Sequence, residues 1–476
     1  MTSDHQDVVS RHPLSLGTLG PDVAAPRHDE SSATLIGVWN RRHFDGRLSA
    51  PVVEFLRGLE DADASAHEFA DRAFRLMRVS GIEATNISHL AAWQIGVIAP
   101  HVLPSAWGGK IPPITAKGRH KLVDQYIATN PWHRPEARGL LVDLGCGFPP
   151  YTTIDSASQL TDWDVIGADP AFGEYLLYDE IGDYACFSDA SSLRYYQAGI
   201  PDQQRWNNLH SDPQATRQRF TALLVELLPL LPAEDPSGAQ VAERGGARLV
   251  RNALREFEGP NLRFREGGLG ALAVEGGADV IRCMNVLVYF DRAFRSRALE
   301  WAATVLKPGG LFICGVNWAR STSSRYSVYQ RVGDALVLRE FAFGIECVRP
   351  IDFLPWYTLH ADESEALQLA NAVRTLRAEE TFRRAYDERL DRILETTQMC
   401  PRGADGYLTT LPADLTPTER EERMESIGLM LRDEGLTGAA VRVLERAGQK
   451  AWVNCVGHVA TLPDDIASLD ALESGL

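Results

Sequence analysis

The stretch that decides the fold is Gly139-Leu140-Leu141-Val142-Asp143-Leu144-Gly145-Cys146-Gly147-Phe148-Pro149-Pro150. An apolar run that ends in an acid and passes into Gly-x-Gly predicts a buried strand, a tight loop and then a helix. The two glycines permit a positive φ and let the backbone approach a ligand closely. Asp143 would then stand at the carboxyl end of a strand, where open α/β sheets bind their ligands.

The same loop excludes two common nucleotide sites. The dinucleotide fingerprint Gly-x-Gly-x-x-Gly needs a third glycine where Pro150 stands, and the Gly-Lys-Ser/Thr of a phosphate-binding P-loop is missing. Pro149 and Pro150 instead fix φ and remove two backbone donors. Because proline is accepted in the first turn of a helix, we expect a helix to begin near Tyr151.

A second predicted strand also ends in an acid. It reads Trp163-Asp164-Val165-Ile166-Gly167-Ala168-Asp169-Pro170. Asp169 follows the glycine turn at about the 20-residue spacing by which one βα unit brings a carboxylate to a ribose diol. The alternative is a surface acid that caps a helix.

Further segments continue the sheet pattern. The segment Ala278–Asp291 holds an apolar strand that breaks into Asn-Val-Leu-Val-Tyr-Phe, and Asp291 is placed to begin a helix. The segment Leu306–Gly315 ends that helix, turns on Pro-Gly-Gly and enters another strand. The alternation in Ala335–Phe341 predicts a hairpin strand beyond it.

In this order, over residues 139–315, these motifs resemble those of class I S-adenosylmethionine-dependent methyltransferases. The resemblance implies an α/β fold: a Rossmann-like, seven-stranded sheet with a helical N-terminal region and an additional, mostly helical C-terminal region. It also implies S-adenosyl-L-methionine as the cofactor. Residues Asn285–Asp291 are similar to a segment of the chemotaxis-receptor glutamate methyltransferases, although Met284 replaces their arginine and their Gly-Glu-Glu loop is absent.

The resemblance also assigns residues to the methionine end of the cofactor. Asp143 would orient the ammonium group, and the turn residues Gly145, Cys146 and Gly147 would bind alongside it. Backbone donors of the helix that follows Gly147 would stabilise the cofactor's carboxylate.

The nucleoside end is assigned to the next two strands. Asp169 and Pro170 would hold the ribose, and Gly268 and Leu269, after the third strand, would lie on the adenine side.

Asn285 and Tyr289 are the candidate catalytic residues. Both follow the fourth strand, where Asn285 would contact the cofactor and orient the methyl acceptor, while Tyr289 would close the pocket wall. The alternative is structural, with Asn285 satisfying its own turn and Tyr289 in the core. No base is assigned, because histidines are more often packed or on the surface; those considered are His89, His101, His120 and His210.

The chain divides into four regions by composition and periodicity. Residues 1–33 are polar and aperiodic and predict a mobile tail, and 34–130 predict a helical region. The resemblance to methyltransferases implies that this helical region covers the site. Residues 131–350 form the expected methyltransferase domain, with an insertion at about 172–260, and 351–476 form the extra, mostly helical region. That last region includes one long amphipathic helix from Asp362 to about Gln398.

The insertion is rich in aromatic residues. Tyrosine and tryptophan side chains suit the wall of a substrate pocket and attract a sulfonium by cation–π interaction. The alternative is a small satellite core. The aromatic residues concerned are Phe172, Tyr175, Tyr178, Tyr184, Phe187, Tyr195, Tyr196 and Trp206.

Composition limits the partners. The net charge of −16 over 476 residues disfavours nucleic acid and anionic membranes. Seven scattered cysteines without a Cys-x-x-Cys pair predict neither a disulfide framework nor a zinc site, and no other metal site is indicated. Because neither a membrane-length apolar run nor a signal-peptide pattern occurs, we expect a cytoplasmic protein.

Three functional hypotheses follow. The first is a methyltransferase acting on an O, N or C nucleophile of a small molecule such as a specialised metabolite, with the extra helical regions enclosing the pocket or forming a homo-oligomer. The second is a protein carboxylate methyltransferase of the glutamate type. The third is a non-catalytic S-adenosylmethionine-binding or assembly module, which the altered turn at Pro149 keeps open.

Overall fold

The structure is a computed structural model of the chain. It describes residues 34–98, 100, 117–199, 205, 208–209, 212–233, 235, 237–412 and 415–475. The tail expected at 1–33 lies outside these residues, as do His101, Trp206 and His210.

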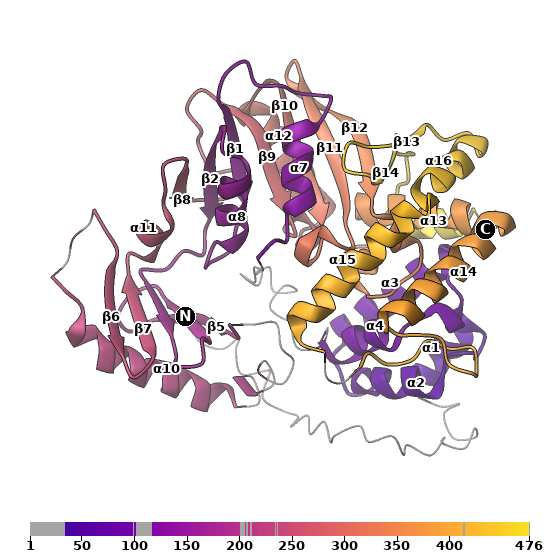
Figure 1. Ribbon diagram of the computed structural model, residues 1–476, viewed down its shortest axis with the longest axis horizontal. Helices are drawn as coiled ribbons and strands as arrows, with labels where there is room; N and C mark the ends of the chain where they lie inside the picture. The colour runs from indigo at the N-terminus through magenta and orange to yellow at the C-terminus, as the bar shows by residue number, and fades with distance from the viewer. Residues whose placement is uncertain are drawn as a thin grey trace.

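The centre of the molecule is a large twisted sheet (Figure 1). Within the described residues it has nine strands, in the order β8-β2-β1-β9-β10-β11-β12-β14-β13. The first five run parallel and the other four alternate in direction. The bounds are β1 (Gly139–Leu144), β2 (Trp163–Asp169), β8 (Leu262–Glu266), β9 (Ala278–Met284), β10 (Leu306–Val316), β11 (Arg325–Val332), β12 (Ala335–Phe343), β13 (Ala451–Val453) and β14 (Val459–Thr461).

This sheet confirms the predicted α/β fold class. It has nine strands where seven were expected, because β13 and β14, from the C-terminal region, extend its antiparallel edge. The strand order reverses beside β1, which pairs with β2 on one side and β9 on the other. Ligands of open α/β sheets bind at such a switch point, beyond the carboxyl ends of the strands.

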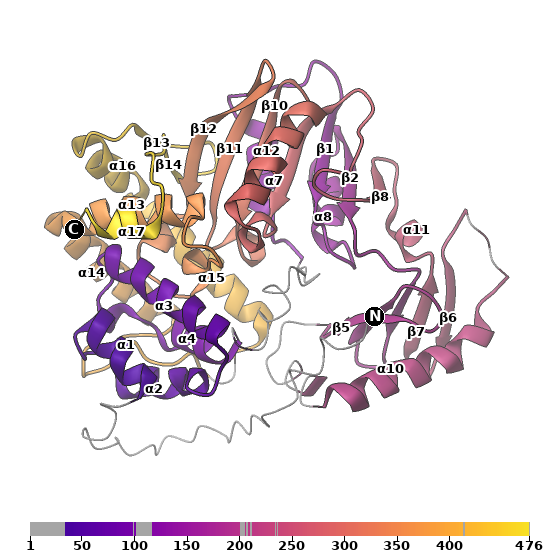
Figure 2. The ribbon, with the colours of Figure 1, turned by 180° about the vertical axis from the view of Figure 1, so that it is seen from behind.

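Helices cover both faces of the sheet. Figure 1 shows α7 (Lys121–Thr129) and α8 (Tyr151–Gln159) in front of it, and Figure 2 shows α12 (Arg292–Val305) on the opposite face. Because side chains alternate along a strand, Leu141 of β1 packs with α7, while Val142 packs with α12. Helix α7, expected within the helical region 34–130, thus belongs to the core of the sheet.

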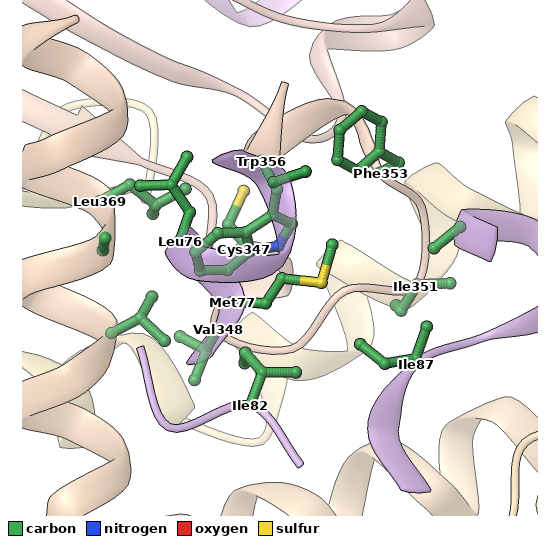
Figure 3. Packing of buried hydrophobic residues seen from close by; sticks show 14 of the residues in the cluster. Leu76, Met77, Ile82, Ile87, Cys347, Val348, Ile351, Phe353, Trp356 and Leu369 are labelled. Carbon is green, nitrogen blue, oxygen red and sulfur yellow. The ribbon is translucent and has the colours of Figure 1, made fainter. Parts of the chain in front are cut away.

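The N-terminal and C-terminal helices share one hydrophobic core. In Figure 3, Leu76 and Met77 of α3 lie beside Cys347, Trp356 and Leu369, which come from the other end of the chain. The two regions therefore pack as one helical unit beside the sheet. Its helices are α1 (Leu35–Phe44), α2 (Ala50–Leu56), α3 (Ala64–Val79), α4 (His89–Trp93), α13 (Ser364–Ala378), α14 (Glu380–Thr397), α15 (Pro417–Asp433), α16 (Leu436–Arg446) and α17 (Leu469–Glu473).

The prediction of one continuous helix from Asp362 to about Gln398 is wrong. It divides into α13 and α14 at Glu379, which leaves the helical region with φ −83° and ψ 103°. The Glu379 carboxylate accepts the backbone N–H groups of Thr381 and Phe382 and so caps α14. Hydrophobic periodicity runs across this break and cannot reveal it. A capping box formed by Thr416 and Glu419, in contrast, stands at the start of α15, where the Thr-x-x-Glu sequence is typical of one.

The insertion folds as a second sheet, which the sequence did not predict. Its strands lie in the order β5-β4-β3-β7-β6, all antiparallel, with α10 (Pro213–Leu227) packed against them. Tyr175, Phe187 and Tyr196 fill the core of this unit, which agrees with the satellite-core alternative. The bounds are β3 (Tyr175–Tyr178), β4 (Tyr184–Phe187), β5 (Leu193–Gln197), β6 (Gln240–Arg244) and β7 (Ala247–Arg251).

Among the described residues, no helix combines the length and the apolar character that crossing a membrane requires.

Candidate functional site

The glycine turn lies at the carboxyl end of β1, where the sequence placed it. Gly145 and Gly147 have φ values of 69° and 73°, in the region that favours glycine. A Cβ on Gly145 would lie 2.4 Å from Cγ2 of Val286, which follows β9. Glycine at 145 therefore allows the ends of β1 and β9 to approach closely.

The turn keeps most of its own backbone donors occupied. The N–H groups of Gly145 and Cys146 donate to the Ala168 carbonyl at 2.8 and 3.4 Å, and that of Gly147 donates to Asp169 Oδ2 at 2.9 Å. Pro149 and Pro150 have no N–H. The turn therefore offers fewer donors to an anionic ligand than the resemblance implies.

Asp169 stands beside the turn at the end of β2. It is buried, and its Oδ1 accepts the Ala171 N–H at 2.7 Å. Burial raises its pKa, although the hydrogen bonds from Ala171 and Gly147 act in the opposite direction. Each carboxylate oxygen has a second lone pair. Asp169 can therefore still accept two hydroxyl groups, as a ribose diol requires.

Pro170 and Gly268 lie side by side, because β2 and β8 are neighbours. A Cβ on Gly268 would lie 3.7 Å from Cδ of Pro170, and the Gly267 N–H is 3.4 Å from the Asp169 carbonyl oxygen. Leu269 packs, half-buried, against the core under this edge. The structure thus brings together the four residues assigned to the nucleoside end.

Asp143 belongs to a buried charge network. Its Oδ1 accepts a hydrogen bond from Nε of Arg282 at 2.9 Å, and its Oδ2 accepts one from the Thr153 hydroxyl at 2.7 Å. Arg282, fully buried, also bonds Asp124 of α7. The network joins β1, β9, α7 and α8. The predicted contact of Asp143 with the cofactor's ammonium stays a prediction.

The charge network holds one cation between two carboxylates. Burial raises the pKa of Asp124 to about 7, more than the attraction of Arg282 lowers it. With a pKa of about 7, Asp124 is partly protonated near neutral pH.

Asn285 makes the turn after β9 in the left-handed region, with φ 59°. Its Nδ2 donates to Oδ1 of Asn317 at 2.9 Å, and its Oδ1 accepts the Asn317 N–H at 3.2 Å. Asn317 follows β10 and is fully buried. Both polar atoms of the Asn285 side chain thus have partners on Asn317 and not within its own turn, and its catalytic role stays a prediction.

Sequence reasoning missed Arg119 and left His120 without a role. Nδ2 of Asn317 donates to the Arg119 carbonyl at 3.0 Å and lies 3.2 Å from Nδ1 of His120. Both side chains are buried, and the Arg119 guanidinium stacks 5.2 Å from the Trp318 ring centre. Burial lowers the pKa of Arg119, while the charges of Tyr289, Glu421 and Tyr184 raise it.

The segment that carries Arg119 crosses the carboxyl edge of the sheet. Gly118 N–H donates to Oδ2 of Asp155 in α8 at 2.6 Å, and Nζ of Lys117 lies 5.4 Å from the Tyr151 ring centre. The segment thus runs from the helix after the glycine turn to Asn317 after β10. The sequence signal was three basic residues, Lys117, Arg119 and Lys121, within the region expected to be helical.

Aromatic residues of the insertion reach this edge at one side. The Tyr195 hydroxyl donates to the Phe148 carbonyl at 2.6 Å, which fastens the second sheet to the glycine turn. Burial raises the pKa of Tyr178 and Tyr184, and the nearby Tyr151 adds to the rise in both.

Tyr289 lies further into the helical unit. It is half-buried, packs against the large helical core and meets Tyr357 edge to face, with 6.0 Å between ring centres. Burial raises its pKa. This position agrees with the structural alternative for Tyr289, although the residue also lies within the electrostatic reach of Arg119.

Comparison with known proteins gives one short sequence match. No protein-family model matches the chain. Over 71 residues the chain is 34% identical to chemotaxis protein methyltransferase 2 of Pseudomonas aeruginosa. The aligned segment covers 15% of this chain and 24% of that protein. The matched segment thus spans about a quarter of that relative's length. The chain is similar to class I S-adenosylmethionine-dependent methyltransferases.

Solved structures of methyltransferases also align with this chain, with low TM-scores. The glycopeptide N-methyltransferase MtfA complexed with sinefungin is 13% identical, with a TM-score of 0.20, over 48% of this chain and 70% of that one. An O-methyltransferase family 2 protein from Planctomyces limnophilus, in complex with apigenin, is 11% identical, with a TM-score of 0.23, over 93% and 98%. Because these scores are low, the fold assignment rests on strand order alone.

Proposed function

We propose that this protein is an S-adenosyl-L-methionine-dependent methyltransferase that acts on a small molecule. The observation that carries the proposal is the pairing of Gly147 with Asp169. The Gly147 N–H, at the turn after β1, donates to a carboxylate at the end of β2, beside the switch point of the sheet. This arrangement supports the proposal, because a carboxylate beside a turn that a ligand can approach closely suits the binding of a ribose diol.

Two groups of residues at this edge would bind the two ends of the cofactor. Asp169 would accept the ribose hydroxyls, while Pro170, Gly268 and Leu269 would line the adenine side. Since the turn keeps its donors occupied, we assign the methionine carboxylate to the guanidinium of Arg119. An arginine matches a carboxylate in charge and in geometry.

The cofactor supplies, when bound, a methyl group on a positively charged sulfur. The protein's task is then to exclude water and to align the acceptor with that methyl group. Asn317 fixes two groups that border this space, the amide of Asn285 and the ring of His120. Asn285 would shape the wall beside the methyl group, and Tyr289 would close it further out.

His120 is placed as a hydrogen-bond donor. Burial and the charges of Arg282 and Arg119 hold the pKa of its imidazole well below the ordinary value, so the ring is neutral. Since Nδ1 faces the Nδ2 donor of Asn317, the ring proton belongs on Nε2. An acceptor that is already deprotonated, such as a carboxylate or a neutral amine, suits a site of this kind.

A protein carboxylate is the second candidate acceptor. The similarity to chemotaxis protein methyltransferase 2 favours it, and a carboxylate needs no base. Transfer of radiolabelled methyl groups into a cell extract, separated into protein and small-molecule fractions, distinguishes the two. Label in small molecules supports the main proposal, and label in protein supports the second. Cofactor binding without label in either fraction indicates the non-catalytic module.

A cytoplasmic location and a homo-oligomer formed through the helical unit belong to the same proposal. Sedimentation analysis of the purified full-length chain tests the oligomer.

A further inference from the structure

Helix α15, in the C-terminal region, is tied to the candidate site by ion pairs. One carboxylate oxygen of Glu425 accepts a hydrogen bond from Nζ of Lys121 at 2.6 Å, and the other accepts one from Nη1 of Arg320 at 2.9 Å. Nη2 of Arg320 also donates to Glu422 at 3.1 Å. Glu425 thus joins α15 to two segments that are distant from it in the sequence.

These two segments carry the groups that border the proposed site. Lys121 comes two residues after Arg119, at the first position of α7. Arg320 belongs to the loop after β10, in which the N–H and the hydroxyl of Ser321 both donate to the Arg119 carbonyl, at 3.0 and 2.9 Å. Asn317 donates to the same carbonyl. The loop therefore bonds the Arg119 carbonyl directly, and α15 bonds the side chains of Lys121 and Arg320 on either side of that contact.

The loop is in a conformation that the surrounding structure has to maintain. Arg320, Ser321 and Ser323 have φ values of 56°, 58° and 53°, which side-chain-bearing residues adopt at a cost. Such conformations persist where neighbouring contacts fix them. Glu425 supplies one such contact, since its side chain is only 18% exposed and it bonds Arg320.

We propose that Glu425 is a positioning residue for the cofactor. By bonding Lys121 and Arg320 together, it holds Arg119 where the guanidinium meets the methionine carboxylate. This inference rests on the proposed function and extends it, because it makes the C-terminal region a part of the cofactor site.

Two ligands separate this role from simple packing. S-adenosylhomocysteine carries the amino-acid end that Arg119 would bind, whereas 5′-methylthioadenosine has the same nucleoside and thioether without that end. In Glu425→Gln we expect the Kd of S-adenosylhomocysteine to rise about tenfold, or about 1.4 kcal/mol. The Kd of 5′-methylthioadenosine should change by less than about twofold, within the ordinary effect of a surface substitution.

Glu434→Gln is the matched control. Glu434 follows α15 and likewise binds two cations, Arg389 at 3.0 Å and Arg392 at 3.1 Å, but both lie on α14, within the helical unit. It should leave the ratio of the two affinities unchanged. Lys121→Gln, which removes one partner of Glu425 at a half-exposed position, should shift the ratio in the same direction as Glu425→Gln.

An unchanged affinity ratio in both Glu425→Gln and Lys121→Gln overturns the proposal, as does an equal shift in Glu434→Gln. Wild-type protein that binds 5′-methylthioadenosine and S-adenosylhomocysteine equally well also overturns it, while the nucleoside site stands. Wild-type protein that binds neither ligand overturns the proposed function itself and, with it, this inference.

Discussion

Asn285 and Asn317 bond each other through their side-chain amides at the carboxyl ends of β9 and β10, with Nδ2 of Asn285 2.9 Å from Oδ1 of Asn317. Asn317 is fully buried and also reaches the Arg119 carbonyl and His120. One amide thus connects two strands with the segment that leads into α7. Its removal should affect both stability and ligand binding.

Asn317→Ala should lower the free energy of unfolding by about 1–3 kcal/mol, because it leaves buried polar partners unsatisfied. It should also weaken the binding of S-adenosylhomocysteine. Urea denaturation and calorimetry measure the two effects. Asn371→Ala is the control, since Asn371 of α13 is also buried and hydrogen-bonded, to Asp464. It should lose stability and keep its affinity; an equal loss of affinity in both variants contradicts the role of Asn317.

Gly145→Ala should destabilise the protein through two effects. The positive φ costs a side-chain-bearing residue about 1–2 kcal/mol, and the added methyl group would meet Val286 at 2.4 Å. Gly333→Ala, in the turn between β11 and β12, shares the positive φ, at 62°, but its Cβ would meet no atom within 4 Å. The thermal midpoint should fall further in Gly145→Ala. Equal shifts would mean that β1 and β9 are not in close contact there.

The stability of the protein should depend on the proton of Asp124. Its pKa is about 7 in the folded protein and about 4 in the unfolded chain, so the folded state holds more protons between these values. The stabilisation from this group is complete below pH 4 and is lost as the pH rises through 7.

Asp124→Asn should remove this dependence. Chemical denaturation at pH 5 and pH 8 should show that the wild type loses more stability between the two than the variant does. Asp334→Asn, at a fully exposed carboxylate, should keep the wild-type difference. If Asp124→Asn shows the wild-type difference as well, Asp124 is ionised at both pH values.

Tyr195→Phe tests the attachment of the insertion to the glycine turn. Loss of the 2.6 Å hydrogen bond to the Phe148 carbonyl should lower the free energy of unfolding by about 1 kcal/mol and increase hydrogen exchange in the turn. Exchange in α14, far from this contact, should stay at the wild-type rate. An unchanged rate in the turn would mean that the two sheets are not coupled there.

Local sequence rules predicted the parallel core of the sheet and the proximity of Asp169 to the glycine turn, while the nucleoside-side roles stay predictions. The apolar runs before Asp143 and Asp169 specify strands, and a short βα unit brings Asp169 to Gly147. Arg119 and Asn317 could not be found in this way. Their meeting depends on how α7 and the loop after β10 pack on the sheet, which no local spacing encodes.

The insertion shows a second limit. Strands of four residues such as Tyr175–Tyr178 and Tyr184–Phe187 are too short for a period-two pattern to stand out, so their aromatic residues indicated a pocket wall or a core equally well. The break at Glu379 shows a third, because a capping carboxylate interrupts a helix without interrupting its apolar face.

The most direct test of the central claim is a calorimetric titration of wild-type protein and Asp169→Ala with S-adenosylhomocysteine. The wild type should bind one molecule per chain, and the variant should bind at least about tenfold more weakly, since it lacks the acceptor for the ribose diol. Asn371→Ala should bind as the wild type does. A wild type that does not bind the ligand, or an Asp169→Ala variant that binds it equally tightly, would contradict the account.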